Sequence, residues 1–225
     1  MKRTFLVVLG AIATLSLPPQ PAGAFPLGFS AVGGIGAGYY SMEELNRHLG
    51  LIAQAERMQL DGITGGANFR IEGRVWVLNT IGLTGGYERF WGETDGEGTS
   101  SSLSYRTPSD VYTIGAIAVL LRIENIFNLC VGANECFAKS VYGTNEFIER
   151  RLSEFKGEDR GFEAYAEIHS NFLNPIEVGL QLGYRGLTIE TFNNKYGGVG
   201  SFEPGRKIEI DYSGAFFYFT TAIRL

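Results

Sequence analysis

Residues 207–225 read KIEIDYSGAFFYFTTAIRL, and this stretch decides the fold class. Apolar and polar residues alternate along its first half, where Ile208 and Ile210 oppose charged neighbours, and a period of two indicates a β-strand with two unlike faces. The apolar set changes parity near Ser213 and Gly214, which predicts a glycine-assisted bulge. A strand this long and aromatic is expected where a closed barrel meets lipid. The predicted residues for membrane anchoring and barrel closure are Phe217, Phe219, Ile223 and Leu225.

The first 24 residues predict a cleaved secretory signal peptide. Lys2 and Arg3 precede an apolar run over residues 5–17, and small residues follow at 22–24. Such a run is too short to span a bilayer as a helix, and a basic start with small residues before a cut is typical of a signal peptide. We expect cleavage after this segment, which leaves residues 25–225 as one mature domain.

The composition favours a β-domain and argues against nucleic-acid binding. Hydrophobic residues make up 44% of the chain and aromatic residues 13%, yet no apolar run after the signal peptide is long enough for a membrane-spanning helix. The formal net charge is −5, and it becomes −5 − 2 = −7 once two basic residues leave with the signal peptide. Nucleic-acid binding requires a basic face, which this balance does not favour.

The cysteines and glycines predict neither a disulfide nor a bound group. Cys130 and Cys136 lie on one expected strand, so their Cα atoms would be about 20 Å apart, beyond disulfide reach. We therefore expect two unpaired thiols, and no His or second Cys has the spacing of a metal site. The Gly-Gly pairs match no phosphate-binding loop, so no cofactor is expected.

The alternation of apolar and polar residues predicts eight strands, over residues 26–40, 63–78, 81–91, 111–123, 127–142, 161–172, 176–191 and 207–225. Short turns follow the second, fourth and sixth strands, at residues 79–80, 124–125 and 174–175. The other connections are long, with polar external loops expected over residues 92–103, 144–160 and 192–206. This asymmetry is typical of outer-membrane barrels. The sequence thus predicts an eight-stranded antiparallel up-and-down transmembrane β-barrel.

One amphipathic helix is expected after the first strand, over residues 42–58. Ser41 and Glu44 have the spacing of a capping box, and apolar residues recur at helical spacing after them. The helix could cover apolar surface at the barrel rim, lie in the membrane interface, or gate the lumen or bind a partner, but a complete helix does not fit inside eight strands. A second short amphipathic helix is predicted over residues 145–156.

By this pattern, though by no diagnostic motif, the chain resembles the small outer-membrane barrels of the OmpA, OmpX and OmpW type over nearly all of residues 25–225. Two features depart from them, because Leu225 stands where those barrels usually end in an aromatic residue and the helix over 42–58 is not a standard part. The resemblance implies a location in a Gram-negative outer membrane, contact with its lipid and assembly by the barrel-assembly machinery. The alternative is a soluble lipocalin-like or streptavidin-like barrel, which would bury its apolar face inside.

The polar faces of the expected strands predict a charged interior. The residues placed there are Arg70, Glu72, Arg74, Glu88, Glu163, Glu167, His169, Arg185, Glu209 and Asp211. The interior of eight strands is just wide enough for side chains, and charges buried singly are costly, so these groups should pair. We expect a lumenal charge network that fills the barrel, and the open alternative is a narrow ion path through the same groups.

The functional expectation is a structural or surface-interacting membrane protein, with an extracellular partner reached through the long loops. The alternative is a small passive channel for ions or a small hydrophobic solute. A more remote alternative is a lipid-modifying acyl hydrolase, which His169 and Ser170 invite. Adjacent residues on a regular strand point to opposite faces, so this pair cannot act as base and nucleophile, and no enzyme is expected.

Overall fold

The computed structural model describes residues 27–97, 102–123, 126–146, 151–173, 175–194, 196, 198–203 and 205–224. The expected signal peptide and Leu225 lie outside these ranges, so the structure tests neither the cleavage site nor the last anchor residue. Within the described ranges, no helix is long and apolar enough to cross a membrane.

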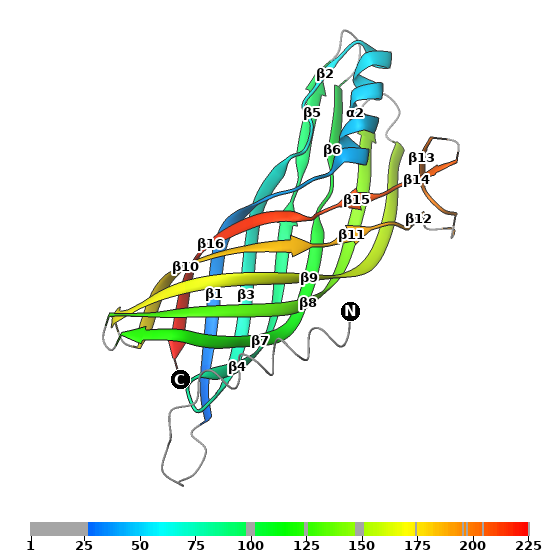
Figure 1. Cartoon of the computed structure of the whole chain (residues 1–225). Helices are drawn as coiled ribbons and strands as arrows, with labels where there is room; N and C mark the ends of the chain where they lie inside the picture. Colours follow the sequence, from blue (N-terminus) through cyan, green and yellow to red (C-terminus); the bar gives the residue numbers. More distant parts are fainter. Residues whose placement is uncertain are drawn as a thin grey trace.

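Eight strands form the barrel, and each pairs with the next one around the ring in an antiparallel ladder. They are β1 (Leu27–Tyr39), β3 (Gly65–Val77), β4 (Ile81–Trp91), β7 (Ser109–Ile123), β8 (Phe127–Glu146), β9 (Arg151–Leu173), β10 (Ile176–Gly186) and β16 (Gly214–Arg224). The ring closes because β16 pairs with both β10 and β1, where Ala31 lies opposite Ile223 (Figure 1). The predicted eight-stranded antiparallel barrel is therefore confirmed.

The connections at one end of the barrel are short, as the sequence predicted. β3 and β4 are joined through Leu78, Asn79 and Thr80, and the first two of these residues have left-handed backbones with φ of 56° and 54°. Two successive positive φ angles match the twist of a tight hairpin. β8 begins at Phe127 shortly after β7 ends, and β10 likewise follows β9 closely.

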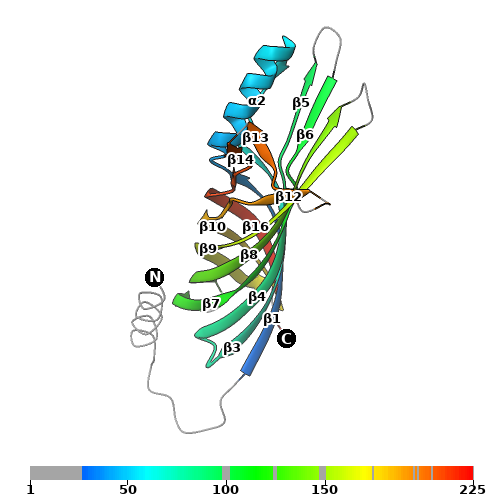
Figure 2. The same ribbon diagram turned by 90° about the vertical axis from the view of Figure 1, so that its right-hand side faces the viewer.

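The opposite end carries more regular structure than the sequence predicted. The expected loop at 92–103 is largely a hairpin of β5 (Glu93–Glu97) and β6 (Ser102–Arg106), and β2 (Gln59–Leu60) pairs with β5. The predicted helix at 145–156 is wrong over its described part, because β8 and β9 continue as paired strands there. β6 and β12 (Phe192–Asn194) pair with these extensions. β8 and β9 continue side by side beyond the barrel (Figure 2), so pairing between strands takes the place of local helical hydrogen bonds.

The stretch that decided the fold class is interrupted in the structure. It comprises β14 (Arg206–Lys207), which pairs with β13 (Ser201–Glu203), then β15 (Ile210–Asp211), which pairs with β11 (Thr188–Ile189), and finally β16. The break falls at Gly214, where a Cβ atom would lie only 1.7 Å from the Tyr39 carbonyl oxygen. No other residue fits this close backbone approach.

The glycine-assisted bulge predicted at this break is wrong, because the pairing register does not shift across it: Arg185 lies opposite Gly214 and Thr188 lies opposite Asp211. Ile208, Ile210 and Tyr212 are buried, and the buried set continues at Phe216 and Tyr218 with the same parity. The same face therefore points inward throughout. In the first half of the stretch the apolar face is the buried one, with Ile208 and Ile210. In the second half apolar residues such as Phe217 and Phe219 also occupy the exposed face, because that face contacts lipid.

Helix α2 (Glu43–Glu56) follows β1 and rises from the end of the barrel opposite the short turns, across from β5 and β6 (Figures 1 and 2). We call this end of the barrel the outer mouth. The predicted capping box is wrong, because the helix start has no side-chain cap and the Ser41 amide donates to the Ser213 carbonyl at 3.0 Å instead. Left-handed residues flank the helix on both sides, Met42 with φ 41° and Arg57 with φ 52°.

The outer surface of the barrel is apolar on all eight strands. Ile35, Leu83 and Leu182 expose 64–66% of their surface, which a soluble barrel would bury. Each barrel strand also presents an outward aromatic residue: Tyr39, Phe69, Trp91, Tyr112, Phe137, Phe162, Tyr184 and Phe217. An apolar band with aromatic residues is the surface that a lipid bilayer selects. The soluble alternative is therefore excluded.

Candidate functional site

The interior holds eight of the ten ionisable residues that the sequence placed there. They come from β3, β4, β9 and β10, and their exposed fractions lie between 0 and 5%. These residues are Arg70, Glu72, Arg74, Glu88, Glu163, Glu167, His169 and Arg185. Their inward direction follows from the local parity of each strand, in which buried and exposed side chains alternate.

The placement of Glu209 and Asp211 in the lumen is wrong. Glu209 is exposed, and Asp211 is half-buried, where it accepts a hydrogen bond from the Thr188 hydroxyl at 3.0 Å. Both lie beyond the membrane band, where the apolar face of the stretch points inward and its charged face points to water. Partial burial and the nearby carboxylates of Glu190 and Glu44 raise the pKa of Glu209.

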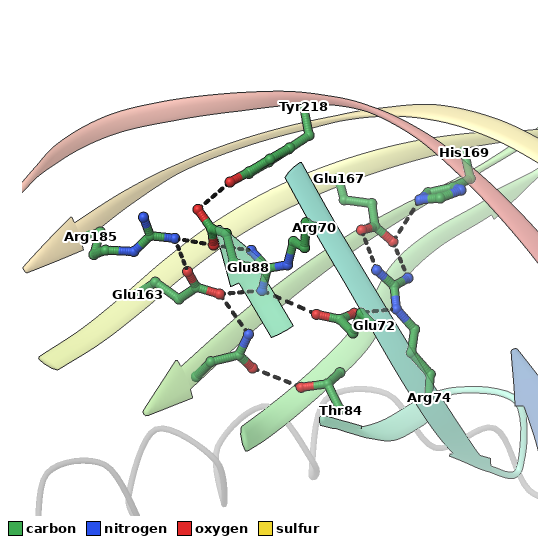
Figure 3. A network of polar contacts seen from close by, with 11 residues as sticks. Arg70, Glu72, Arg74, Thr84, Glu88, Glu163, Glu167, His169, Arg185 and Tyr218 are labelled. Carbon is green, nitrogen blue, oxygen red and sulfur yellow. Dashed lines mark hydrogen bonds and ion pairs between the residues drawn. The ribbon is translucent and has the colours of Figure 1, made fainter. Parts of the chain in front are cut away.

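Two arginines share one carboxylate at the centre of the lumen (Figure 3). The Nη2 group of Arg185 donates to Glu163 Oε2 at 2.9 Å and also to Glu88. Arg70 donates to the other oxygen of Glu163, and its Nη2 lies 3.1 Å from Glu72 Oε2. Glu163 thus bridges two guanidinium groups, which is the charge-assisted bonding that a buried carboxylate needs.

Arg74 links this centre to His169 (Figure 3). Its Nε atom donates to Glu72 Oε1 at 2.6 Å, and both of its Nη atoms contact the carboxylate of Glu167. The Nε2 atom of His169 lies 2.9 Å from Glu167 Oε1, without the alignment of a hydrogen bond. The ionic groups therefore form one continuous chain of contacts.

Neutral side chains that were not among the predicted lumenal residues complete the network. Tyr218 donates its hydroxyl hydrogen to Glu88, which ties the last strand to β4. Asn134 Nδ2 donates to Glu163 Oε1 at 2.7 Å, and the Thr84 hydroxyl donates to Asn134 Oδ1 at 2.7 Å. Their inward parity was the available signal, but only contact geometry identifies which carboxylate each one binds.

Apolar side chains lie on either side of the ionic layer. Toward the outer mouth, Leu45 and Leu49 of α2 pack in a buried cluster with Phe90, Ile208 and Ile210. Toward the short turns, a second buried cluster includes Trp76, Ile117 and Val119. Along the barrel axis, the interior therefore has three layers. An ionic layer lies in the middle, an apolar layer that includes side chains of α2 lies toward the outer mouth, and a mixed apolar and polar layer lies toward the short turns.

Other candidate groups do not assemble into a reactive centre. His169 is buried inside the barrel, whereas Ser170 lies on the alternate side of β9, so the two side chains do not face each other. Cys130 and Cys136 are buried free thiols, as expected. In the part of the chain that the structure describes, no group of three or more His, Cys, Asp or Glu side chains could hold a metal ion.

A closed ring of eight strands with an apolar outer surface and an ionic interior defines a small β-barrel protein of the cell outer membrane. No protein-family model and no curated protein sequence matches the chain.

Solved structures of outer-membrane proteins do resemble it. OprG from Pseudomonas aeruginosa superposes with a TM-score of 0.53 at 9% identity, over 90% of this chain and 98% of that one. Ail of Yersinia pestis, in complex with the heparin analogue sucrose octasulfate, gives a TM-score of 0.48 at 12% identity, over 88% of this chain and 99% of that one. Neisserial surface protein A gives 0.45 at 11% identity, over 92% and 99%. At 9% identity, the likeness to OprG supports the barrel fold of this chain and says nothing about its activity.

Proposed function

We propose that the protein is a non-conducting outer-membrane barrel whose task lies at the cell surface, where the part of the chain beyond the membrane contacts a partner. This part, which we call the extension, comprises α2, β2, β5, β6, β12 and the adjoining ends of β8 and β9. The observation that carries this proposal is the filled interior. The eight ionisable side chains of the lumen expose 0–5% of their surface, so solvent hardly reaches them. A conducting pore needs groups that solvated ions can reach.

The apolar outer layer supports the same conclusion. Leu45 and Leu49 of α2 expose 0% and 1% of their surface, and they pack against side chains that line the inner wall. An ion entering from the outside would have to displace this layer before it reached the first charge. The interior therefore acts as a packed core that stabilises the barrel.

The length of β8 and β9 supports a role for the extension. These strands have 20 and 23 residues, whereas about 9–11 tilted residues cross a bilayer. Roughly half of each strand therefore projects beyond the lipid, where β2, β5, β6 and β12 join the same sheet. A rigid projecting sheet backed by α2 is suited to presenting a surface to other molecules.

Conductance measurements test the first half of the proposal. Purified protein that has passed a heat-modifiability gel, on which folded barrels migrate anomalously until boiled, is added to a planar lipid bilayer. We expect no discrete current steps at either polarity. Regular steps that scale with protein concentration and vanish after boiling would contradict a filled lumen and support the passive channel.

Thiol labelling of intact cells tests the second half. The native cysteines are buried, so the wild-type protein serves as the unlabelled control. Tyr196→Cys, at a residue with 84% exposure beyond the outer mouth, should react with a membrane-impermeant maleimide on whole cells. Ile126→Cys, 52% exposed at a short turn, should react only after lysis. The reverse pattern would place the extension in the periplasm.

A further inference from the structure

The barrel closes at a seam between β1 and β16, and the side chains of this seam leave its pairing register open. Glycine occupies successive inward positions of β1, at Gly34, Gly36 and Gly38. The two backbones approach closely there, because a Cβ atom at Gly36 would collide with the Phe217 carbonyl oxygen. A slip of two residues puts another glycine in that place and keeps every side chain on its own face, and glycine-rich strands specify their register weakly.

The register at the seam decides the dimensions of the whole barrel. Paired residues followed once around the ring lead from Asn128 on β8, through Gly34 and Thr220 at the seam, to Ala138 on β8 again. The stagger is therefore 138 − 128 = 10 residues, and a slip of two at the seam would make it 10 − 2 = 8 or 10 + 2 = 12. Strand tilt, stagger and diameter are linked, so each value gives a barrel of different width.

The side chains of the lumen make contacts that depend on this width. Four of these contacts link β3 or β4, on one side of the seam, to β9, β10 or β16, on the other side. They join Arg70 to Glu163, Arg74 to Glu167, Arg185 to Glu88, and Tyr218 to Glu88 (Figure 3). The first two contacts lie between β3 and β9, and we call them the rungs. Because the partners of a rung are 93 positions apart in the chain, no local turn holds them together.

A slip at the seam disturbs the rungs but leaves the backbone ladder intact. Two residues along a strand correspond to about 7 Å, and the ring shares this displacement among its strands while its diameter changes. Antiparallel backbone hydrogen bonds recur every two residues, so the seam recovers them after the slip. The ionisable groups of the lumen expose only 0–5% of their surface, so water cannot replace a lost partner.

We propose that the ionic layer selects the register in which the barrel closes, and thereby fixes its stagger at ten residues. The glycine-rich seam supplies pairing in several registers, and the rungs distinguish among them. Buried ionic groups can specify one arrangement among several of similar stability. This role concerns which barrel forms, and it is independent of the surface contact proposed above.

Cysteine cross-linking at the seam tests the proposal. Ala31 and Ile223 lie opposite each other on the lipid-facing side, so Ala31→Cys with Ile223→Cys should form a disulfide on oxidation. Ala31→Cys with Thr221→Cys, and Gly33→Cys with Ile223→Cys, report a slip of two residues in either direction. These pairs are diagonal neighbours in the observed register, about 7–8 Å apart, and should cross-link poorly with the wild-type lumen. Mass spectrometry of the digested protein counts each disulfide.

The decisive variant combines Arg70→Gln, Glu163→Gln, Arg74→Gln and Glu167→Gln, which removes both rungs and equal numbers of positive and negative charges. We expect the ratio of native to slipped cross-links to fall by at least about tenfold, because one buried ion pair discriminates by that factor or more. Arg106→Gln with Glu93→Gln is the matched control, since this exposed pair lies outside the lumen and should leave the ratio unchanged.

Three results would overturn the proposal. The first is a variant without rungs that passes the heat-modifiability gel and forms only the native cross-link. If the four substitutions prevent folding, Arg74→Gln with Glu167→Gln takes their place, and slipped cross-links above the wild-type level support the proposal. A wild-type pattern in this second variant contradicts it. Failure of the second variant to fold contradicts it too, because the pair would then hold the barrel together and not choose its register.

Discussion

Replacement of Arg74 by methionine is the most direct test of the lumenal network. Arg74→Met keeps a side chain of similar length and removes the cation that contacts Glu72 at 2.6 Å and Glu167 through both Nη atoms. Both carboxylates then stay in the interior with fewer partners. The ionic layer then holds only two guanidinium groups, those of Arg70 and Arg185, against the carboxylates of Glu72, Glu88, Glu163 and Glu167.

The magnitude follows from what remains around the two carboxylates. Breaking a buried ion pair by removing one partner costs about 3–5 kcal/mol, because an uncompensated charge stays buried. Glu72 keeps Arg70 at 3.1 Å, and Glu167 keeps His169 at 2.9 Å. These residual contacts place the expected loss near the lower limit, at about 3 kcal/mol in the free energy of unfolding.

Urea unfolding in lipid vesicles, with the folded fraction measured on a heat-modifiability gel, gives this free energy. Arg106→Met is the matched control, because Arg106 contacts Glu93 at 2.7 Å but the two side chains are 68% and 45% exposed. An exposed pair contributes about 0–1 kcal/mol. If Arg74→Met destabilises the barrel no more than Arg106→Met does, the ionic layer does not hold the barrel together and the reasoning fails. Arg74→Met combined with Glu167→Gln should recover part of the loss.

Two further predictions address the apolar layer and the lipid contact. Leu45→Ala, at a side chain with 0% exposure, should cost about 2–5 kcal/mol in the free energy of unfolding. Leu51→Ala on the same helix, 45% exposed, should cost no more than about 0.5 kcal/mol, and equal costs would mean that α2 is not packed on the barrel. Leu182→Arg, 64% exposed on the outer face of β10, should cost about 2–4 kcal/mol in vesicles because the guanidinium enters lipid. Leu51→Arg, outside the lipid, should be nearly neutral, and a neutral Leu182→Arg would contradict the membrane assignment.

Local parity was enough to predict the barrel strands and the ionic interior. Along β3, Ile71 and Val75 are exposed while Arg70, Glu72 and Arg74 are buried, as the period of two requires. The short turns were also predictable, because Asn79 belongs to the residues that tolerate a left-handed backbone. In these segments each signal depends only on residues next to one another in the chain.

The extension beyond the membrane was not predictable in this way. Residues 103–106 form a strand because they pair with residues 143–146 on β8, which are distant in the sequence. Residues 151–156 have helical spacing of apolar residues, yet the ladder with β8 satisfies their backbone groups. Tertiary pairing overrides a weak local preference where a neighbouring strand supplies the hydrogen bonds.

By itself, the sequence determined the number of barrel strands, the short connections between three pairs of them and the sorting of eight ionisable side chains onto the polar faces of their strands. Only the tertiary structure decided which charges meet and where Ile208, Ile210 and Glu209 point. The physical reason is that alternation separates two faces of a strand without saying which face is inside. Inside the membrane the apolar face turns to lipid, whereas beyond it the same kind of face turns inward, beneath α2.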